Sequence, residues 1–243
     1  SGSQGAVQAL TGDGFGGFTA GGVFGIGSLP GGLAAQDIGG TSAVDLMSTN
    51  VGADSVSLLF GDGAAGFTST PSHLIASGAF IYGLDSADMN ADSKIDLAVT
   101  RTDENHVNVL LGSGTGTFSA GPTLVLPGNQ PGDAGATAVL IRNFTSDGIL
   151  DIAALNGSLE SLSVFPGTGP GTFGSRADYG LGNSCNQSSG AGCITPEAIS
   201  DGPLNDTDST HPDLIVSNSS GDGAFPYGSI SVFLQSGGGF GSA

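Results

Sequence analysis

Residues 88–97 read Asp88-Met-Asn90-Ala-Asp92-Ser-Lys94-Ile-Asp96-Leu97, with an oxygen-bearing side chain at every second position except Lys94. Calcium binds six to eight oxygen atoms at about 2.3–2.6 Å. A tight loop that directs its first, third, fifth and ninth side chains inward, together with the carbonyl of its seventh residue, supplies most of them. The stretch therefore predicts a loop that binds Ca²⁺ as a cofactor. The expected ligands are Asp88, Asn90, Asp92, the carbonyl of Lys94, and Asp96.

The same frame recurs along the chain. A glycine follows 16 residues after each of Asp45, Asp96 and Asp151, and a loop with the same spacing precedes each of these aspartates. The candidate ligands of the first loop are Asp37, Thr41 and Asp45, and those of the third are Asn143, Thr145, Asp147, the carbonyl of Ile149, and Asp151. A fourth loop, whose register the sequence does not fix, offers Asn205, Asp206, Asp208 and Asp213. The alternative for all four is a plain turn, because Asp and Asn also cap their own backbone.

A short apolar strand follows each loop and runs into a turn and a phenylalanine. These strands are 56–60, 107–111, 162–166 and 230–234, with a weaker copy at 7–11. The phenylalanines recur at intervals of roughly 50 to 70 residues, a period typical of propeller blades. The expected fold is all-β, either a β-propeller or a propeller fragment of about four to five four-stranded antiparallel blades, with almost no helix.

Residues 88–100, 107–111 and 112–118 together resemble the FG-GAP/VCBS repeat, the calcium-binding blade unit of integrin-type β-propellers. The resemblance extends over nearly the whole chain, and it implies a single propeller-like domain. Its expected parts are a partial blade at 1–29, blades at about 30–74, 75–125, 126–180 and 194–243, and an insertion at 181–193.

Composition excludes several functional classes. Twenty-two acidic residues face only four Lys and Arg, and the formal net charge of −18 repels nucleic acid and anionic membranes. No apolar run reaches the roughly 18 residues that span a bilayer, and no secretory signal segment is present. Because residue 1 is serine, we expect a processed or trimmed product.

The two cysteines, Cys185 and Cys193, enclose a short segment of the 181–193 insertion. A disulfide between them is the preferred interpretation, and it indicates an oxidising compartment and a secreted or extracellular protein. The alternative is a pair of free thiols.

The sequence does not favour an enzyme, because its three histidines are scattered and the carboxylates are explained by metal loops. The sequence predicts four copies of the first two strands of a blade but five copies of the last two strands. This mismatch favours a structural or adhesion role, in which the chain self-associates into extracellular filaments by completing blades between subunits, or binds another extracellular protein. The alternatives are a calcium-dependent, glycan-binding lectin-like propeller and a trimmed fragment of a larger propeller.

Overall fold

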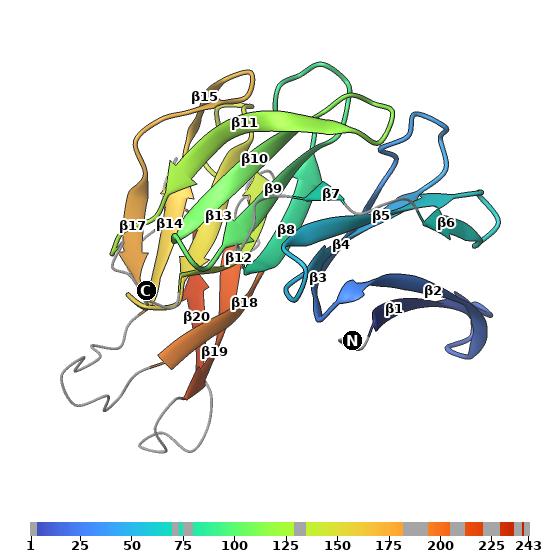
Figure 1. Cartoon of the computed structure of the whole chain (residues 1–243). Coiled ribbons are helices and arrows are strands. Elements are labelled where there is room, and N and C mark those ends of the chain that lie inside the picture. The colour runs from blue at the N-terminus through green and yellow to red at the C-terminus, as the bar shows by residue number, and fades with distance from the viewer. Residues whose placement is uncertain are drawn as a thin grey trace.

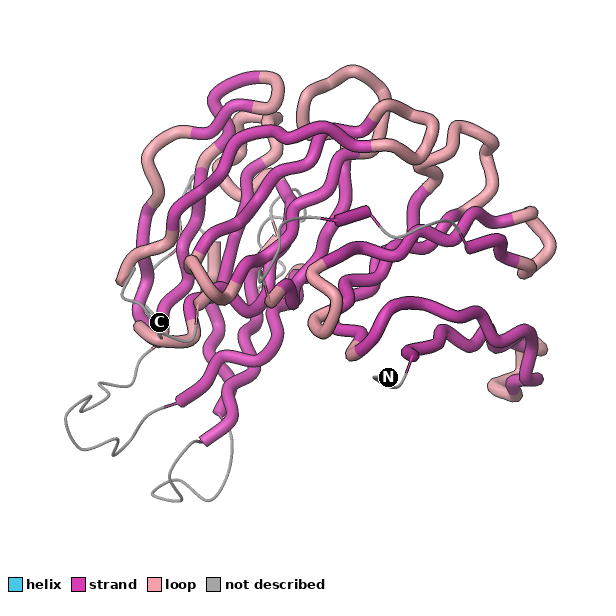
Figure 2. Tube along the Cα trace, in the orientation of Figure 1, coloured by secondary structure: helices cyan, strands magenta, loops and turns pink. Residues whose placement is uncertain are grey.

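The computed structural model describes residues 4–69, 73–74, 80–128, 135–181, 194–204, 212–220, 229–235 and 240. Every regular element in these ranges is a β-strand, as Figure 2 shows, which confirms the all-β prediction. No helix in the described residues could therefore span a membrane.

The strands form a propeller-like ring of four small antiparallel sheets, preceded by a separate hairpin (Figure 1). We call the sheets blades 1 to 4. The hairpin pairs β1 (Gln4–Gly12) with β2 (Phe18–Ser28). Blade 1 contains β3 (Pro30–Gln36), β4 (Asp45–Asn50), β5 (Ser55–Gly61), β6 (Phe67–Ser69) and β7 (His73–Leu74), and blade 2 contains β8 (Ile81–Ala87), β9 (Asp96–Arg101), β10 (His106–Gly112) and β11 (Phe118–Val125). Blade 3 contains β12 (Ala136–Arg142), β13 (Asp151–Asn156), β14 (Ser161–Phe165) and β17 (Ala177–Gly180), with a small hairpin of β15 (Gly167–Gly169) and β16 (Thr172–Phe173). Blade 4 contains β18 (Ile194–Gly202), β19 (Asp213–Ser220) and β20 (Ser229–Phe233).

The core lies between the blades. One cluster of buried side chains joins blades 1 and 2, a second joins blades 2 and 3, and a third joins blades 3 and 4. The second strands of blades 2 and 3, β9 and β13, are buried on both faces because a neighbouring blade covers each face. These strands therefore read as continuous apolar runs after their first aspartate, without the polar alternation of a half-exposed strand.

The innermost strands β3, β8, β12 and β18 lie next to one another in that order and bring the blades together around the centre (Figure 1). Small residues permit their close approach. A Cβ atom on Gly83 of β8 would lie 2.8 Å from the Cα of Ala138 in β12. The glycine is therefore a packing requirement between blades 2 and 3.

Candidate metal centre and central cavity

A buried aspartate begins the second strand of every blade. Asp45, Asp96 and Asp151 are fully buried, and Asp213 is 1 % exposed. One oxygen of each carboxylate accepts a hydrogen bond from the loop that precedes the strand, and the other accepts one from a residue at the end of the third strand or just beyond it. We call this arrangement the aspartate clamp. It fastens the loop to the chain that leaves the third strand.

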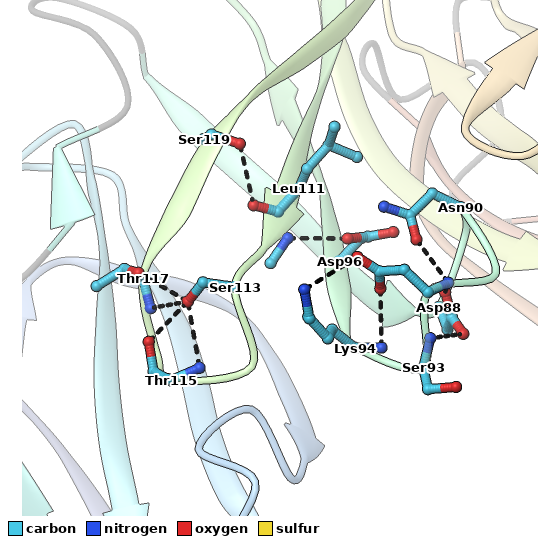
Figure 3. Close-up of polar contacts among 12 residues, drawn as sticks. Asp88, Asn90, Ser93, Lys94, Asp96, Leu111, Ser113, Thr115, Thr117 and Ser119 are labelled. Atoms are coloured by element: carbon cyan, nitrogen blue, oxygen red, sulfur yellow. Dashed lines mark hydrogen bonds and ion pairs between the residues drawn. The ribbon is translucent and has the colours of Figure 1, made fainter.

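In blade 2 the clamp is Asp96, which Figure 3 shows between the loop and the end of β10 near Leu111. Its Oδ2 accepts from the Met89 backbone N–H at 3.0 Å, and its Oδ1 accepts from that of Gly112 at 2.8 Å. The spacing of 16 residues follows from this contact. A side chain at Gly112 would also collide with the backbone oxygen of Ile95, and the glycines at 61 and 167 are in the same position against Val44 and Leu150. The distance of 16 residues, repeated in three blades, is therefore explained by one hydrogen bond and one steric requirement.

Burial raises the pKa of Asp96 and of Asp151, against the opposing effect of the backbone N–H groups that donate to them. A cation beside either carboxylate would favour its charged form and reduce this penalty. The clamp residues thus occupy a place where a bound divalent ion has an electrostatic benefit.

The other expected ligands of blade 2 lie on the bend of the loop, where Asp88 and Asn90 are half-buried and Asp92 and Lys94 are exposed (Figure 3). Asp88 accepts hydrogen bonds from the backbone N–H groups of Asp92 and Ser93, at 3.1 and 2.8 Å. Asn90 accepts from Asp92 at 3.0 Å, and Asp92 accepts from the Lys94 N–H at 2.9 Å. The side-chain oxygens therefore line a single tight turn, in which Ala91 and Ser93 have positive φ.

Loops 1 and 3 repeat parts of this geometry. Asp37 accepts from the N–H groups of Thr41 and Ser42, and the hydrogen bond from Ser42 lowers the pKa of Asp37. Asn143 accepts from Ser146, and Asp147 accepts from Ile149. Thr145 differs, because its N–H and hydroxyl both donate to Asp151.

Several expected site residues cannot be placed. Asn205, Asp206 and Asp208 lie outside the described residues, as do Cys185 and Cys193, so the fourth loop and the disulfide stay predictions. Within the described ranges, no three histidine, cysteine, aspartate or glutamate side chains come together as a metal-binding group. The second loop offers a different donor set, with an amide and a backbone carbonyl beside its carboxylates, and its chemistry fits a hard cation. The assignment of ligands to Ca²⁺ stays a prediction.

We expect Asp92→Ala to lower the melting temperature in calcium and to have little effect in chelator, because a solvent-exposed ligand contributes mainly through the ion. Thermal unfolding followed by circular dichroism in both buffers measures this. The matched control is Asp62→Ala, since Asp62 accepts from the N–H groups of Ala64 and Gly66 in an ordinary hairpin turn. Equal losses for Asp92→Ala in the two buffers would contradict a ligand role.

A second candidate site lies at the centre of the ring. A cavity of about 440 Å³ is lined by residues of all four innermost strands. Tyr82, 47 % exposed, and the carboxylate residues Asp85 and Glu197 are among them. The cavity's volume lies in the range of small-molecule sites.

Irregular backbone shapes this cavity. Each innermost strand has a register shift where it lines the cavity, between Pro30 and Leu33, Ile81 and Leu84, Ala136 and Val139, and Pro196 and Ala198. Bulges of this kind redirect side chains and are frequent beside functional sites. At the end of the innermost strands, Arg142 forms ion pairs with Asp85 at 3.1 Å and with Asp201 at 3.0 Å, and so links β12 to β8 and β18.

Sequence reasoning did not identify this cavity. Its signal was weak but present, because Gly32 and Gly83 interrupt strands at the same distance, 13 residues, before Asp45 and Asp96. Glycines inside a strand mark bulges or a close approach of backbone.

Comparison with known proteins supports the fold. No protein-family model matches the sequence, and no curated protein matches it. Among solved structures, a protein from Lactobacillus plantarum superposes with a TM-score of 0.68 at 16 % identity, over 98 % of this chain and 63 % of that one. An Agrocybe aegerita lectin that recognises non-reducing terminal N-acetylglucosamine superposes with a TM-score of 0.56 at 20 % identity, over 97 % of this chain and 59 % of the lectin. The chain therefore spans about three fifths of each of these two structures.

At these identities the similarity shows a β-propeller fold alone. The resemblance to FG-GAP/VCBS repeats has no family match behind it and stays a prediction.

Proposed function

We propose that this chain is a secreted, non-catalytic β-propeller module that binds carbohydrate in its central cavity and is stabilised by calcium in its blade loops. The observation that carries the proposal is the half-exposed Tyr82 among the residues that line the cavity, together with Glu197. The lectin of similar fold supports this alternative over a purely structural role.

Sugar rings present an apolar face and a rim of hydroxyl groups. A tyrosine ring offers a flat apolar surface with a polar end, which suits stacking against such a face. Glu197 provides an acceptor for hydroxyl groups and already accepts a hydrogen bond from Ser219 at 2.6 Å, which orients its carboxylate.

Catalysis is not part of the proposal. A hydrolytic site needs a nucleophile or a general acid beside an oriented partner. His106 lies 3.5 Å from Glu104 at a blade turn and does not line the central cavity, while Asp85 is committed to Arg142 and to the Ile141 N–H. The cavity residues therefore suit binding better than proton transfer.

Calcium enters the proposal as a structural cofactor. When bound, it would neutralise part of the −18 charge and hold each loop closed. Extracellular modules bind calcium with dissociation constants of about 10⁻⁴ to 10⁻³ M, which suits a secreted protein and not an intracellular sensor.

Binding to a glycan array in calcium tests the function, followed by titration calorimetry with the best glycan. We expect Tyr82→Ala to weaken binding about tenfold, which corresponds to about 1.4 kcal/mol, because it removes the stacking surface. Tyr82→Phe keeps the ring and should bind within a few-fold of the natural chain.

Val125→Ala serves as the matched control, since Val125 is 42 % exposed and does not line the cavity. An array with no bound glycan, or equal binding by the natural chain and Tyr82→Ala, would contradict the proposal.

A further inference from the structure

The open face of blade 4 exposes large apolar side chains. Ile230, Val232 and Leu234 are 69 %, 41 % and 47 % exposed, whereas the alternating residues Ser231 and Phe233 are buried against blade 3. This face is separate from the proposed carbohydrate site. A complementary apolar face lies on the N-terminal hairpin of the same chain.

The aspartate clamp fixes which residues correspond. Asp213 accepts from the Gln235 N–H as Asp45 accepts from Gly61, so positions five, three and one before Gln235 correspond to Val56, Leu58 and Phe60. Val56 and Leu58 are 0 % and 3 % exposed, and all three pack with side chains of blade 2. The corresponding Val107 and Val109 are buried against blade 3. In every internal blade, therefore, the following blade covers this face.

The N-terminal hairpin exposes the opposite half of such a junction. Its register matches that of β10 and β11: Leu10 pairs with Ala20 and Gly12 with Phe18, as Leu110 pairs with Ala120 and Gly112 with Phe118. Leu110 is 7 % exposed, and both Leu110 and Phe118 pack into the cluster shared with blade 1. Leu10 and Phe18 are 57 % and 72 % exposed.

In the part of the chain that the structure describes, the hairpin is covered on its other side only. Phe24 packs edge-on against Phe67 of blade 1 with ring centroids 5.2 Å apart, and Ile26 is 7 % exposed. Figure 1 shows the hairpin beside blade 1, separate from the four sheets. The hairpin face with Leu10 and Phe18 thus corresponds to the face of blade 2 that packs against blade 1.

We propose that the two faces bind each other between copies of this chain, with the hairpin of one copy packed on blade 4 of the next. One chain carries both halves of a junction that it already forms three times internally. Charge repulsion does not oppose the contact, although the chain has 22 acidic residues. Residues 229–235 contain no charged side chain, and residues 4–28 contain one, Asp13.

Such pairing is head-to-tail, and its two surfaces differ. Interfaces of this type form rings when the rotation closes and open filaments when it does not. The contact buries blade faces and leaves the central cavity of each copy in place.

Sedimentation velocity in calcium over a wide range of protein concentration tests the proposal. We expect the natural chain to form species larger than the 23.6 kDa monomer, and Leu10→Glu and Val232→Glu each to remain monomeric. An equimolar mixture of the two variants should form a heterodimer and nothing larger, since each variant keeps the face that the other has lost. Val125→Glu is the matched control, because Val125 is as exposed as Val232 and lies on neither face.

Circular dichroism and calcium-dependent melting establish that each variant is folded. A natural chain that is monomeric at every concentration would overturn the proposal, and a blade from outside residues 1–243 would then be the partner of these faces. A second result would also overturn it. If the natural chain forms oligomers but the equimolar mixture of the two variants stays monomeric, the contact is not head-to-tail. Neither result bears on glycan binding, which is measured separately.

Discussion

Asp96→Ala is expected to unfold blade 2 or bring the whole chain close to its unfolding threshold, in calcium and in chelator alike. The fully buried carboxylate accepts from the N–H groups of Met89 and Gly112. Alanine leaves both donors without a partner, at about 1–3 kcal/mol for each, so the loss is roughly 2–6 kcal/mol. A domain has only about 5–15 kcal/mol of stability in total. Urea denaturation followed by circular dichroism measures the change.

Two comparisons sharpen this result. Asp62→Ala removes a carboxylate that also accepts from two backbone N–H groups, but in an exposed turn where water can replace it, so it should destabilise the chain much less than Asp96→Ala. Asp92→Ala should cost little in chelator. If Asp96→Ala were as mild in chelator as Asp92→Ala, the clamp would not be a principal source of stability.

Gly112→Ala is expected to destabilise the chain by about 3 kcal/mol. The added methyl group would overlap the backbone oxygen of Ile95, and the glycine N–H is itself a donor to Asp96. The strands must separate to admit the methyl group, and the clamp hydrogen bond then lengthens. Alanine has less backbone freedom in the unfolded state than glycine, which by itself would favour the variant. A measured loss therefore reports the steric conflict.

The matched control is Gly12→Ala, at the same place in the N-terminal hairpin. There an added Cβ would meet only the Phe18 ring, at 3.6 Å. Urea denaturation should show the control near or slightly above the natural stability. Equal losses for the two variants would mean that Ile95 moves away without cost.

Much of the fold could be predicted from the sequence, because the repeat is encoded in residues whose physical roles are narrow. The apolar runs at 46–49, 97–100, 152–155 and 214–217 all form the second strands of blades. The distance from Asp96 to Gly112 was visible as a spacing, but its cause was not. Aspartate serves both roles: its carboxylate can accept backbone hydrogen bonds across a sheet, or it can bind a cation. The sequence alone does not distinguish the two.

The central cavity could not be predicted, since it depends on contacts between strands far apart in sequence. Tyr82, Asp85 and Glu197 share no local pattern, and they meet because β8 and β18 lie on either side of β12. The exposed face of blade 4 was likewise hidden. Ile230 and Val232 have the same pattern as Val56 and Leu58, and only the arrangement of blades distinguishes a covered face from an open one.

Calcium binding by the blade loops is the property on which the proposed stabilisation depends, and calorimetric titration of the chelator-treated chain with Ca²⁺ measures it most directly. We expect binding to the loops at 88–96 and 143–151, with dissociation constants of about 10⁻⁴ to 10⁻³ M, and a melting temperature that rises with calcium. If Asp92→Ala loses the tighter of the two classes of calcium sites, the loop at 88–96 is the stronger site. An absence of binding heat, together with identical melting in calcium and in chelator, would contradict the calcium assignment and leave the loops as hydrogen-bonded turns.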